Sequence, residues 1–270
     1  MADRPAGRPT GALDEPADQR YVGARDLTHW PSTAGRLAAR GAHRLRRWLQ
    51  PHQVLTLTLA VGFALTAVLT ALAGAVYDSV TEADGVVLLD RPALDAAISE
   101  RTPLGNHVAA GYALVGGSVG MSVLATVTAV ALALLWRRWT PVVLIAATAA
   151  GSLALTVIGK AVVGRTRPPL ADAVPPFEST PSFPSGHALN SLAIAGIVAY
   201  LLVREQRSAR VRALTVSLAA AFAVTMGMSR VYLGAHWFSD VLVAWALGLA
   251  WLTVVIVAHR LLLTLRRPGS

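Results

Sequence analysis

The feature that most constrains this chain is a series of uncharged apolar runs, several of them about 18 residues or longer. A run of that length is enough for a helix to cross the hydrocarbon core of a bilayer. The composition agrees, because 54% of the residues are hydrophobic and only 14% are charged, which is unusual for a soluble domain. We therefore predict an all-α, polytopic membrane protein with a six-transmembrane-helix bundle.

The predicted organisation has three parts. Residues 1–50 form a cytoplasmic tail, disordered because it is rich in Pro, Gly, Ala, Asp and Arg, which ends in an Arg-rich interfacial segment. Residues 51–264 form the transmembrane domain, and residues 265–270 are a basic cytoplasmic tail. The six spans are expected at about 54–76, within 108–135, and at about 142–163, 187–203, 213–232 and 237–263. A Pro-rich loop, 164–184, separates the third span from the fourth.

Positive charge predicts the orientation of the bundle. The formal net charge is +9, and arginines flank the apolar runs, which favours membrane topology over nucleic-acid binding as their explanation. With six spans, the arginine-rich segments before span one, between spans two and three, between spans four and five and after span six fall on one side. That side is predicted to be cytoplasmic, in a cell membrane, with both termini there. The first apolar run begins near Val54, too deep for a cleaved signal, and is expected to be a retained anchor.

Three polar clusters lie at the opposite side. In the first, Lys160, Gly164 and Arg167 are spaced i, i+4, i+7, so we expect them to share one helical face. Gly164 would let a ligand or backbone approach that face, and Pro168 would end the helix. Lys160, the only lysine, lies in an apolar span and suits a buried anion. The alternative is a lysine that snorkels to the lipid headgroups.

The second cluster is Pro184-Ser185-Gly186-His187, directly before span four. Ser185 is a typical N-cap, and the free N–H groups of a helix start bind phosphate well. In the third cluster, Arg230 ends span five, while His236 and Asp240 open span six four residues apart. A carboxylate on one ring nitrogen leaves the other free to attack. Taken singly, a capped helix and a stabilising His–Asp pair are the simpler explanations.

Topology brings the three clusters to one membrane face. Three cations, a helix N-terminus, two histidines and one carboxylate suit a phosphate dianion and the charge of a transferring phosphoryl group. The clusters lack the several carboxylates of a magnesium or calcium site. Two histidines with Asp240 are also a conceivable zinc set, but the surrounding positive charge argues against a cation. The absence of cysteine excludes disulfides and thiolate metal sites. We expect no metal and no other cofactor.

These residues resemble the signature of the type 2 phosphatidic acid phosphatase superfamily, in its bacterial membrane branch. Every fixed position of the signature is matched, by Lys160/Arg167/Pro168, Pro184–His187 and Ser229/Arg230/His236/Asp240. The resemblance implies that His236 attacks phosphorus and forms a phosphohistidine, that Asp240 orients it, and that His187 protonates the leaving group. It also implies that Lys160, Arg167, Ser185, Gly186 and Arg230 bind the phosphate. Arg165, between fixed positions, is expected to be at most accessory.

The implied function is metal-independent hydrolysis of a lipid phosphate or pyrophosphate monoester at the extracytoplasmic face. Phosphatidic acid, phosphatidylglycerol phosphate and polyprenyl (pyro)phosphates are the candidate substrates, and the expected partners are this substrate and membrane lipids, not nucleic acid. A silent lipid-phosphate binder or flippase stays open, although such a protein would be expected to lose one of the histidines. A vanadate-dependent haloperoxidase shares the signature, but those enzymes are soluble. The sequence does not give the physiological lipid or the oligomeric state.

Overall fold

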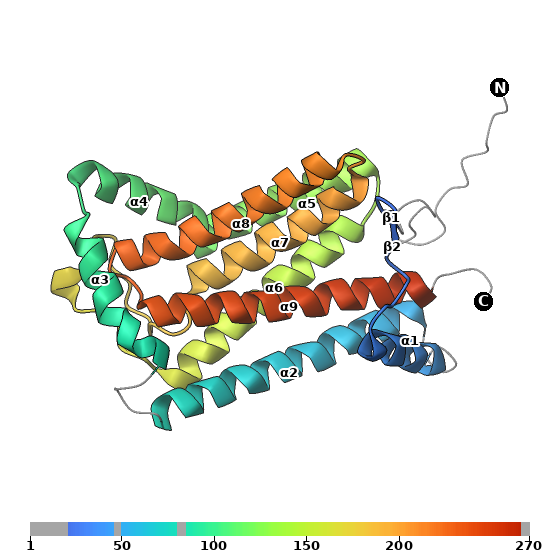
Figure 1. The fold of residues 1–270 in the computed structure, drawn as a ribbon, viewed down its shortest axis with the longest axis horizontal. Coiled ribbons are helices and arrows are strands. Elements are labelled where there is room, and N and C mark those ends of the chain that lie inside the picture. The colour runs from blue at the N-terminus through green and yellow to red at the C-terminus, as the bar shows by residue number, and fades with distance from the viewer. Residues whose placement is uncertain (1–20, 46–49, 80–84, 266–270) are drawn as a thin grey trace.

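The computed structural model describes residues 21–45, 50–79 and 85–265. These residues form nine α-helices, two 3-10 helices and a two-stranded hairpin (Figure 1). The bounds are β1 Tyr21–Val22, β2 Arg25–Asp26, α1 Thr33–Leu45, α2 Pro51–Ser79, η2 Gly85–Leu89, α3 Asp90–Ser99, α4 Pro103–Gly116, α5 Ser118–Trp136, α6 Thr140–Val163, η3 Leu170–Asp172, α7 Gly186–Glu205, α8 Ala209–Tyr232 and α9 Phe238–Leu265.

Five helices, α5 to α9, are long and apolar enough to cross a membrane. This confirms the all-α, polytopic membrane architecture. The remaining predicted span coincides with α2, a helix of 29 residues in which the part with described side chains, His52–Val68, is apolar. The count of six spans therefore stays a prediction that depends on α2.

The second predicted span is interrupted. The apolar run within 108–135 is divided between α4 and α5 at Gly117, whose extended backbone (φ −67°, ψ 168°) ends one helix and begins the next. Two adjacent glycines, Gly116 and Gly117, disfavour a continuous helix here because glycine loses more backbone freedom than other residues on folding. As a result α4 diverges from α5 and packs on α7 and α8 (Figure 1).

The core is centred on α7, which packs against α6, α8 and α9, while α2 covers α6 and α9. Leu155 of α6, Leu189 of α7 and Val241 of α9 are completely buried in this core. Small residues let the helices approach closely, as is usual inside membrane bundles. Gly151 of α6, for example, lies against the indole of Trp251, where any larger side chain would collide with the ring.

The N-terminal segment differs from the disordered tail that its composition predicts. Residues 21–45 form the hairpin and α1, and they pack at one end of the bundle (Figure 1). Arg260 of α9 donates hydrogen bonds to the carbonyls of Leu27 and His29, and its guanidinium lies 4.2 Å from the ring of Trp30. These contacts join residues more than 200 positions apart, so local composition does not show them. The rest of the predicted tails, 1–20, 46–49 and 266–270, lies outside the described residues.

The opposite end of the bundle carries α3 and the loop 164–185 (Figure 1). This loop is fastened to the end of α8: the Val174 N–H donates to the Leu233 carbonyl at 2.8 Å, and Arg101 binds the carbonyls of Tyr232 and Asp172. Gly234 makes the approach possible. It has a positive φ of 65°, and a Cβ there would lie 2.3 Å from the Asp172 carbonyl oxygen. The loop is thus held over the helix ends where the polar clusters lie.

Candidate active site

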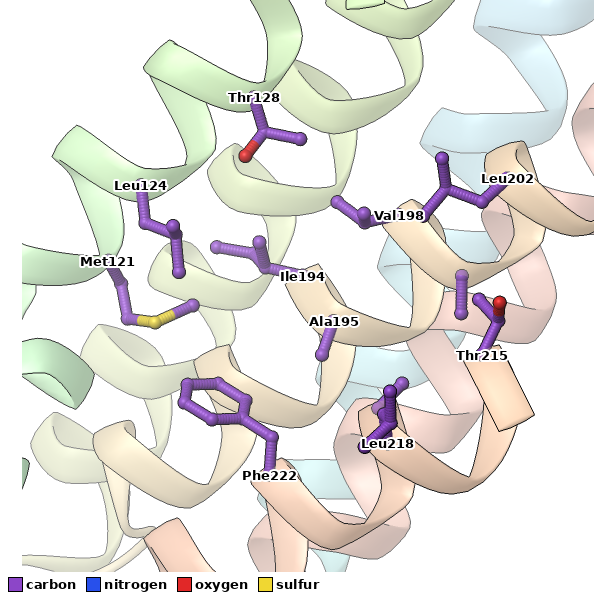
Figure 2. Close-up of a pocket in the computed structure, with 12 residues that line it drawn as sticks. Met121, Leu124, Thr128, Ile194, Ala195, Val198, Leu202, Thr215, Leu218 and Phe222 are labelled. Carbon is purple, nitrogen blue, oxygen red and sulfur yellow. The ribbon is translucent and has the colours of Figure 1, made fainter. Parts of the chain in front are cut away.

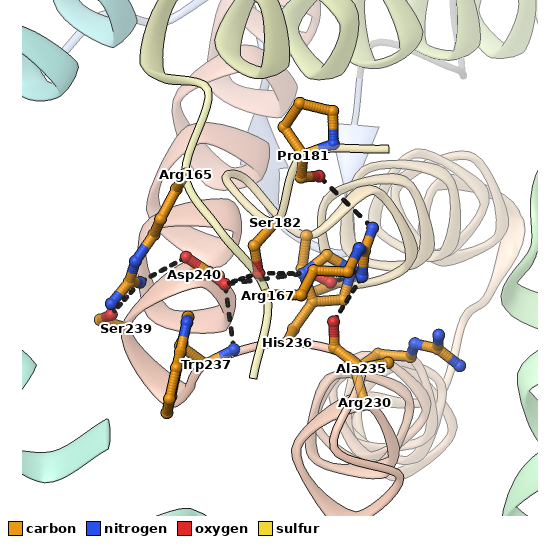
Figure 3. A network of polar contacts seen from close by, with 12 residues as sticks. Arg165, Arg167, Pro181, Ser182, Arg230, Ala235, His236, Trp237, Ser239 and Asp240 are labelled. Atoms are coloured by element: carbon orange, nitrogen blue, oxygen red, sulfur yellow. Dashed lines mark hydrogen bonds and ion pairs between the residues drawn. The ribbon is translucent and has the colours of Figure 1, made fainter. Parts of the chain in front are cut away.

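The three polar clusters meet at this end of the bundle. Helix α6 ends at Val163 and α8 at Tyr232, while α7 begins at Gly186 and α9 at Phe238, and these four termini lie together (Figure 1). Figure 3 shows Arg167, Arg230, His236 and Asp240 gathered around the folded loop. Segments far apart in sequence are in direct contact here, for example Arg165 and Asp240, which are 75 positions apart.

The centre of the cluster is occupied by the carboxylate of Glu178, a residue of the loop. Its Oε2 accepts a hydrogen bond from Arg167 Nη2 at 2.7 Å, and its Oε1 accepts one from Arg230 Nη2. Arg230 is only 2% exposed. A buried guanidinium needs an anionic partner, and in this structure Glu178 supplies the anion. We call the group formed by Arg167, Arg230, His187 and His236 around this carboxylate the cradle.

The two histidines lie on either side of this carboxylate, one near each of its oxygens. His236 Nε2 lies 3.9 Å from Glu178 Oε2, and His187 Nδ1 lies 3.8 Å from Glu178 Oε1. The His187 ring also lies near the backbone of Ala113 in α4. An anion in the cradle is therefore flanked by one imidazole on each side.

The other nitrogen of His236 points to Asp240. Its Nδ1 lies 3.6 Å from Asp240 Oδ2, and the same oxygen accepts hydrogen bonds from the Ser182 hydroxyl and, at 3.0 Å, from the Trp237 N–H (Figure 3). On the cradle side, Arg167 Nη1 lies 3.3 Å from Nε2. A donor at Nε2 and a carboxylate at Nδ1 favour the tautomer that has its proton on Nδ1 and a lone pair on Nε2. That lone pair faces the cradle.

Asp240 is itself held by a second set of charges. Its Oδ1 accepts a hydrogen bond from Arg165 Nη1 at 2.6 Å, and Arg165 Nη2 binds Asp90 Oδ2, also at 2.6 Å. Asp90 further accepts bonds from the N–H and hydroxyl of Ser239, each at 2.8 Å. Arg165, expected to be at most accessory, thus contacts the carboxylate that faces His236.

The remaining predicted residues lie around the rim of the cradle. Lys160 binds the Thr180 hydroxyl at 3.1 Å and the Pro181 carbonyl, so in this structure it holds the loop rather than the central anion. Ser185 is the N-cap of α7, as expected, with its hydroxyl accepting from the Ala188 N–H, and Gly186 is the first residue of that helix. No group of three or more His, Asp or Glu side chains in the described part of the chain is placed to hold a metal ion.

Two expectations about the first cluster need correction. Lys160 and Arg167 do not share a helical face, because α6 ends at Val163 and Arg167 reaches the cradle from the loop. No backbone approaches Gly164 closely, since the space where its Cβ would lie is open. Its role is conformational: with a φ of 62° it caps α6 in the left-handed region, which costs glycine little. The chain turns there toward the site.

Burial and charge together shift the pKa values of Glu178 and His236. Burial alone would raise the pKa of Glu178, but Arg230, His236 and Arg167 outweigh burial and lower it to about 2. Burial lowers the pKa of His236 below its usual value, although Asp240 opposes the shift. Glu178 is therefore an anion at neutral pH, and His236 is the neutral imidazole that a nucleophile must be.

The guanidinium of Arg230 has a hydrogen-bond donor that Glu178 does not use. Its Nε is buried and has no hydrogen-bond partner among the described residues, even with Glu178 in the cradle. Buried donors are normally satisfied, and an unsatisfied one calls for an explanation such as a ligand that is not present. A phosphate has more acceptor oxygens than a carboxylate, so it is able to reach donors that Glu178 leaves unused.

Four residues of the site were missed or undervalued from the sequence: Asp90, Arg165, Glu178 and Ser182. Glu178 had a weak signal, since it is one of two acidic residues in a loop between cationic clusters. Ser182 had none, because a serine in a Pro-rich loop is ordinary. Asp90 lies 75 residues before Arg165, and its pairing depends on the path of the whole chain.

Comparison with known proteins agrees with this geometry. The PAP2 superfamily model matches residues 140–262, a range that contains the whole set from Lys160 to Asp240. Phosphatidylglycerophosphatase B of Bacillus subtilis (strain 168) is 32% identical over 155 residues, which cover 57% of this chain and 75% of the relative. The chain belongs to the PAP2 superfamily.

A solved PAP2 structure supports the same assignment. The crystal structure of a transmembrane PAP2-type phosphatidylglycerolphosphate phosphatase from Bacillus subtilis matches with a TM-score of 0.61 and 28% identity. The match covers 72% of this chain and 92% of that one. Like these PAP2 relatives, the protein is a phosphatase and an integral membrane protein.

Proposed function

We propose that this PAP2 protein removes phosphate from a membrane lipid that carries a phosphate or pyrophosphate monoester, through a phosphohistidine on His236 and without a metal. Phosphatidic acid, phosphatidylglycerol phosphate and polyprenyl (pyro)phosphates are the substrates to be compared. The similarity to phosphatidylglycerophosphatase activity in Bacillus subtilis, by sequence and by structure, makes phosphatidylglycerol phosphate the first of these to test.

The observation that carries the proposal is the position of Glu178. Its carboxylate binds Arg167 and Arg230 and has His236 on one oxygen and His187 on the other. It stands in for two of the oxygens of a phosphoryl group. A phosphate in that place has a nucleophile and a proton donor on either side, which is the arrangement that in-line phosphoryl transfer requires.

In the first step, the lipid phosphate displaces Glu178 and the His236 Nε2 lone pair attacks phosphorus. A P–N bond forms, and the P–O bond to the lipid breaks. The bound phosphate dianion favours a proton on His187, which gives its Nδ1 proton to the leaving oxygen. Arg167 and Arg230 stabilise the negative charge on the non-bridging oxygens, and Asp240 stabilises the positive charge that develops on the His236 ring. We assign Lys160, Ser185 and the Gly186 N–H to the same oxygens.

In the second step, water replaces the lipid alcohol or lipid phosphate. His187, now neutral, takes a proton from the water as its oxygen attacks phosphorus. The P–N bond breaks, orthophosphate leaves, and the His236 Nε2 lone pair is restored.

Space for the rest of the substrate lies beside the cradle and along the bundle. A pocket of about 190 Å³ adjoins Arg167 and Glu178 and is also lined by Phe177 and Pro176, which suits a small headgroup. The larger cavities are apolar: one of about 360 Å³ lies between α5, α7 and α8 (Figure 2), and one of about 570 Å³ lies between α7, α8 and α9. No charged side chain lines either, so neither is a phosphate site.

We place the cradle on the extracytoplasmic side of the cell membrane. The support is charge: the loops and segments at the other end of the bundle contain Arg137, Arg138, Arg204 and Arg207, among others, and positive residues favour the cytoplasmic side. Residues 21–45, with both described chain ends, lie at that same end (Figure 1).

The test is phosphate release from the candidate lipids by purified protein in detergent that contains EDTA. The wild type is expected to be active on at least one lipid, and His236→Ala is expected to lose activity entirely. His107→Ala is the matched control, because His107 is exposed on α4 and bonds only its own helix. Wild-type turnover by His236→Ala would reject the nucleophile, and lipid movement without phosphate release would favour a silent binder.

A further inference from the structure

A chain of buried charges leads away from His236, on the side opposite the cradle. It runs from Asp240 to Arg165 and then to Asp90, with contacts of 2.6 Å at each step. The side chains of Asp240, Arg165 and Asp90 are 0%, 10% and 5% exposed. Burying three charges is costly unless each is paired, so this arrangement needs a reason beyond stability.

The two carboxylate oxygens of Asp240 have different partners. Oδ2 faces His236 and accepts from Ser182 and Trp237, whereas Oδ1 accepts from Arg165. Arg165 therefore fixes the rotation of the carboxylate about its Cβ–Cγ bond. The Arg165 side chain cannot turn freely, because its second nitrogen is bound to Asp90 and its guanidinium lies 5.6 Å from the ring of Trp237.

Asp90 also anchors the start of α9 directly. It accepts from the Ser239 N–H and hydroxyl, both in the first turn of the helix that carries Asp240. Helix starts have unpaired N–H groups that a carboxylate satisfies well. Asp90 thus holds both the helix and the arginine that together determine where the Asp240 carboxylate lies.

The signs of the charges matter as much as the geometry. Arg165 alone would neutralise Asp240 and weaken its effect on His236. Asp90 compensates the positive charge of Arg165, so that Asp240 keeps its full negative charge toward the imidazole. This is the charge that favours an Nδ1 proton and stabilises a positively charged phosphohistidine ring.

We propose that Asp90 and Arg165 are positioning residues, which hold the Asp240 carboxylate so that His236 keeps its attacking tautomer and its basicity. The inference rests on the proposed role of His236 as nucleophile. Neither residue touches the cradle, so neither is expected to affect the binding of phosphate itself.

The decisive variant is Asp90→Asn, which keeps the shape and the ability to bind Ser239 but removes the charge. We expect kcat to fall roughly 10- to 100-fold, the range seen when carboxylates that orient metal-bound histidines are changed, with KM little altered. Asp95→Asn is the matched control, since Asp95 lies in the same helix and is 53% exposed. It is expected to leave kcat unchanged.

A second measurement does not depend on turnover. The groups that face His236 are Asp240 from α9, and Arg167 and Glu178 from the loop, with Arg230 and His187 across the cradle. With these unchanged, loss of the Asp90 charge makes the potential at the ring more positive. NMR titration of the histidine rings, with the His236→Ala spectrum for assignment, is expected to show His236 protonating at lower pH in Asp90→Asn. The acid limb of kcat/KM should move in the same direction.

These measurements distinguish a failure of the proposed function from a failure of the positioning role of Asp90. If the wild type is inactive on every lipid but the His236 titration still moves in Asp90→Asn, the proposed function fails and the positioning role stands. If activity falls while the titration and tautomer of His236 stay as in the wild type, Asp90 is merely structural and the inference is overturned. Should Asp90→Asn fail to fold, as judged by thermal unfolding in detergent, Arg165→Gln is the second variant, because Asp240 then loses its Oδ1 partner. Its kcat is again expected to fall, but His236 is expected to protonate at higher pH, since a cation next to Asp240 is lost. An unchanged His236 titration in Arg165→Gln would overturn the inference.

Discussion

Glu178 pairs with Arg230 at the position that the proposed mechanism assigns to phosphate. The other oxygen of the same carboxylate binds Arg167, which the mechanism also uses. In this structure the positive charge of the cradle is thus partly neutralised by its own loop. A lipid phosphate must displace this internal anion, and the displacement opposes binding.

Replacing Glu178 by Gln is expected to make inorganic anions bind more tightly. Gln keeps the size of the side chain but leaves Arg167 and Arg230 without a negative partner, so orthophosphate competes with a neutral amide. We expect the inhibition constant of orthophosphate or vanadate to fall about tenfold, corresponding to ~1.4 kcal/mol. Asp172→Asn, the other acidic residue of the loop, pairs only with Arg91 among the ion pairs described and is the control. Unchanged or weaker inhibition in Glu178→Gln would contradict the competition.

The ion pair between Glu178 and Arg230 also makes the stability of the fold depend on pH. The pKa of Glu178 is lowered from 4.5 to about 2, so its charge stabilises the fold fully above about pH 4.5, and this contribution is lost as the pH falls toward 2. Allowing for its partial exposure, we expect about 2 kcal/mol. Unfolding in detergent should therefore show the wild type more stable than Glu178→Gln at pH 7, with the gap closing below pH 4.5. If the difference in the free energy of unfolding between the two proteins is the same at pH 3 and pH 7, the ion pair does not stabilise the fold.

Ser182 is expected to contribute moderately to catalysis. Its hydroxyl donates to Asp240 Oδ2 and lies 3.4 Å from His236 Nδ1, so it helps to hold the carboxylate against the ring. A buried hydrogen bond of this kind contributes ~1 kcal/mol, which predicts that kcat falls about fivefold in Ser182→Ala. Ser179→Ala, exposed in the same loop, should have wild-type kcat. Equal kcat in the two variants would remove Ser182 from the site.

The sequence predicts the bundle well because apolar length is a local property. The predicted third span, 142–163, corresponds to α6 Thr140–Val163, and the predicted fifth, 213–232, to α8 Ala209–Tyr232. The break at Gly117 was missed, since the apolar composition continues through it while the backbone does not. The fastening of residues 21–45 to Arg260 was missed because both partners look like ordinary flanking segments.

The candidate site was predictable only where the signature has fixed spacing. His236 and Asp240 are only four residues apart, so their contact is local in the chain, although His236 lies two residues before the start of α9 and not on the helix where it was expected. Glu178 and Asp90 reach the site through the path of a loop and through the packing of α3, which depend on the whole fold. For the same reason Arg167, expected on the face of a helix, arrives from the loop after Gly164.

Two glycines with similar backbone angles provide a matched test of how the loop is held. Gly164→Ala places a Cβ in open space and costs only the left-handed conformation, about 1 kcal/mol. Gly234→Ala costs the same and in addition drives its Cβ against the Asp172 carbonyl, so the loop that carries Arg167 and Glu178 must shift. We expect a larger loss of thermal stability in Gly234→Ala and a clear loss of kcat/KM. Equal effects of the two substitutions would show that the close approach of the loop is unimportant.

The orientation of the bundle is testable because the chain contains no cysteine. Ser179→Cys places a single thiol beside the cradle, and Ser208→Cys places one in the basic loop before α8, both at exposed positions. If the arginine-rich loops lie in the cytoplasm, a membrane-impermeant maleimide labels Ser179→Cys in intact cells. It should reach Ser208→Cys only after the membrane is permeabilised. Since α7 alone separates the two positions, one crossing of the bilayer must place them on opposite sides. Labelling in the reverse order would put the cradle in the cytoplasm, where the lipid phosphates it meets are those of the inner leaflet.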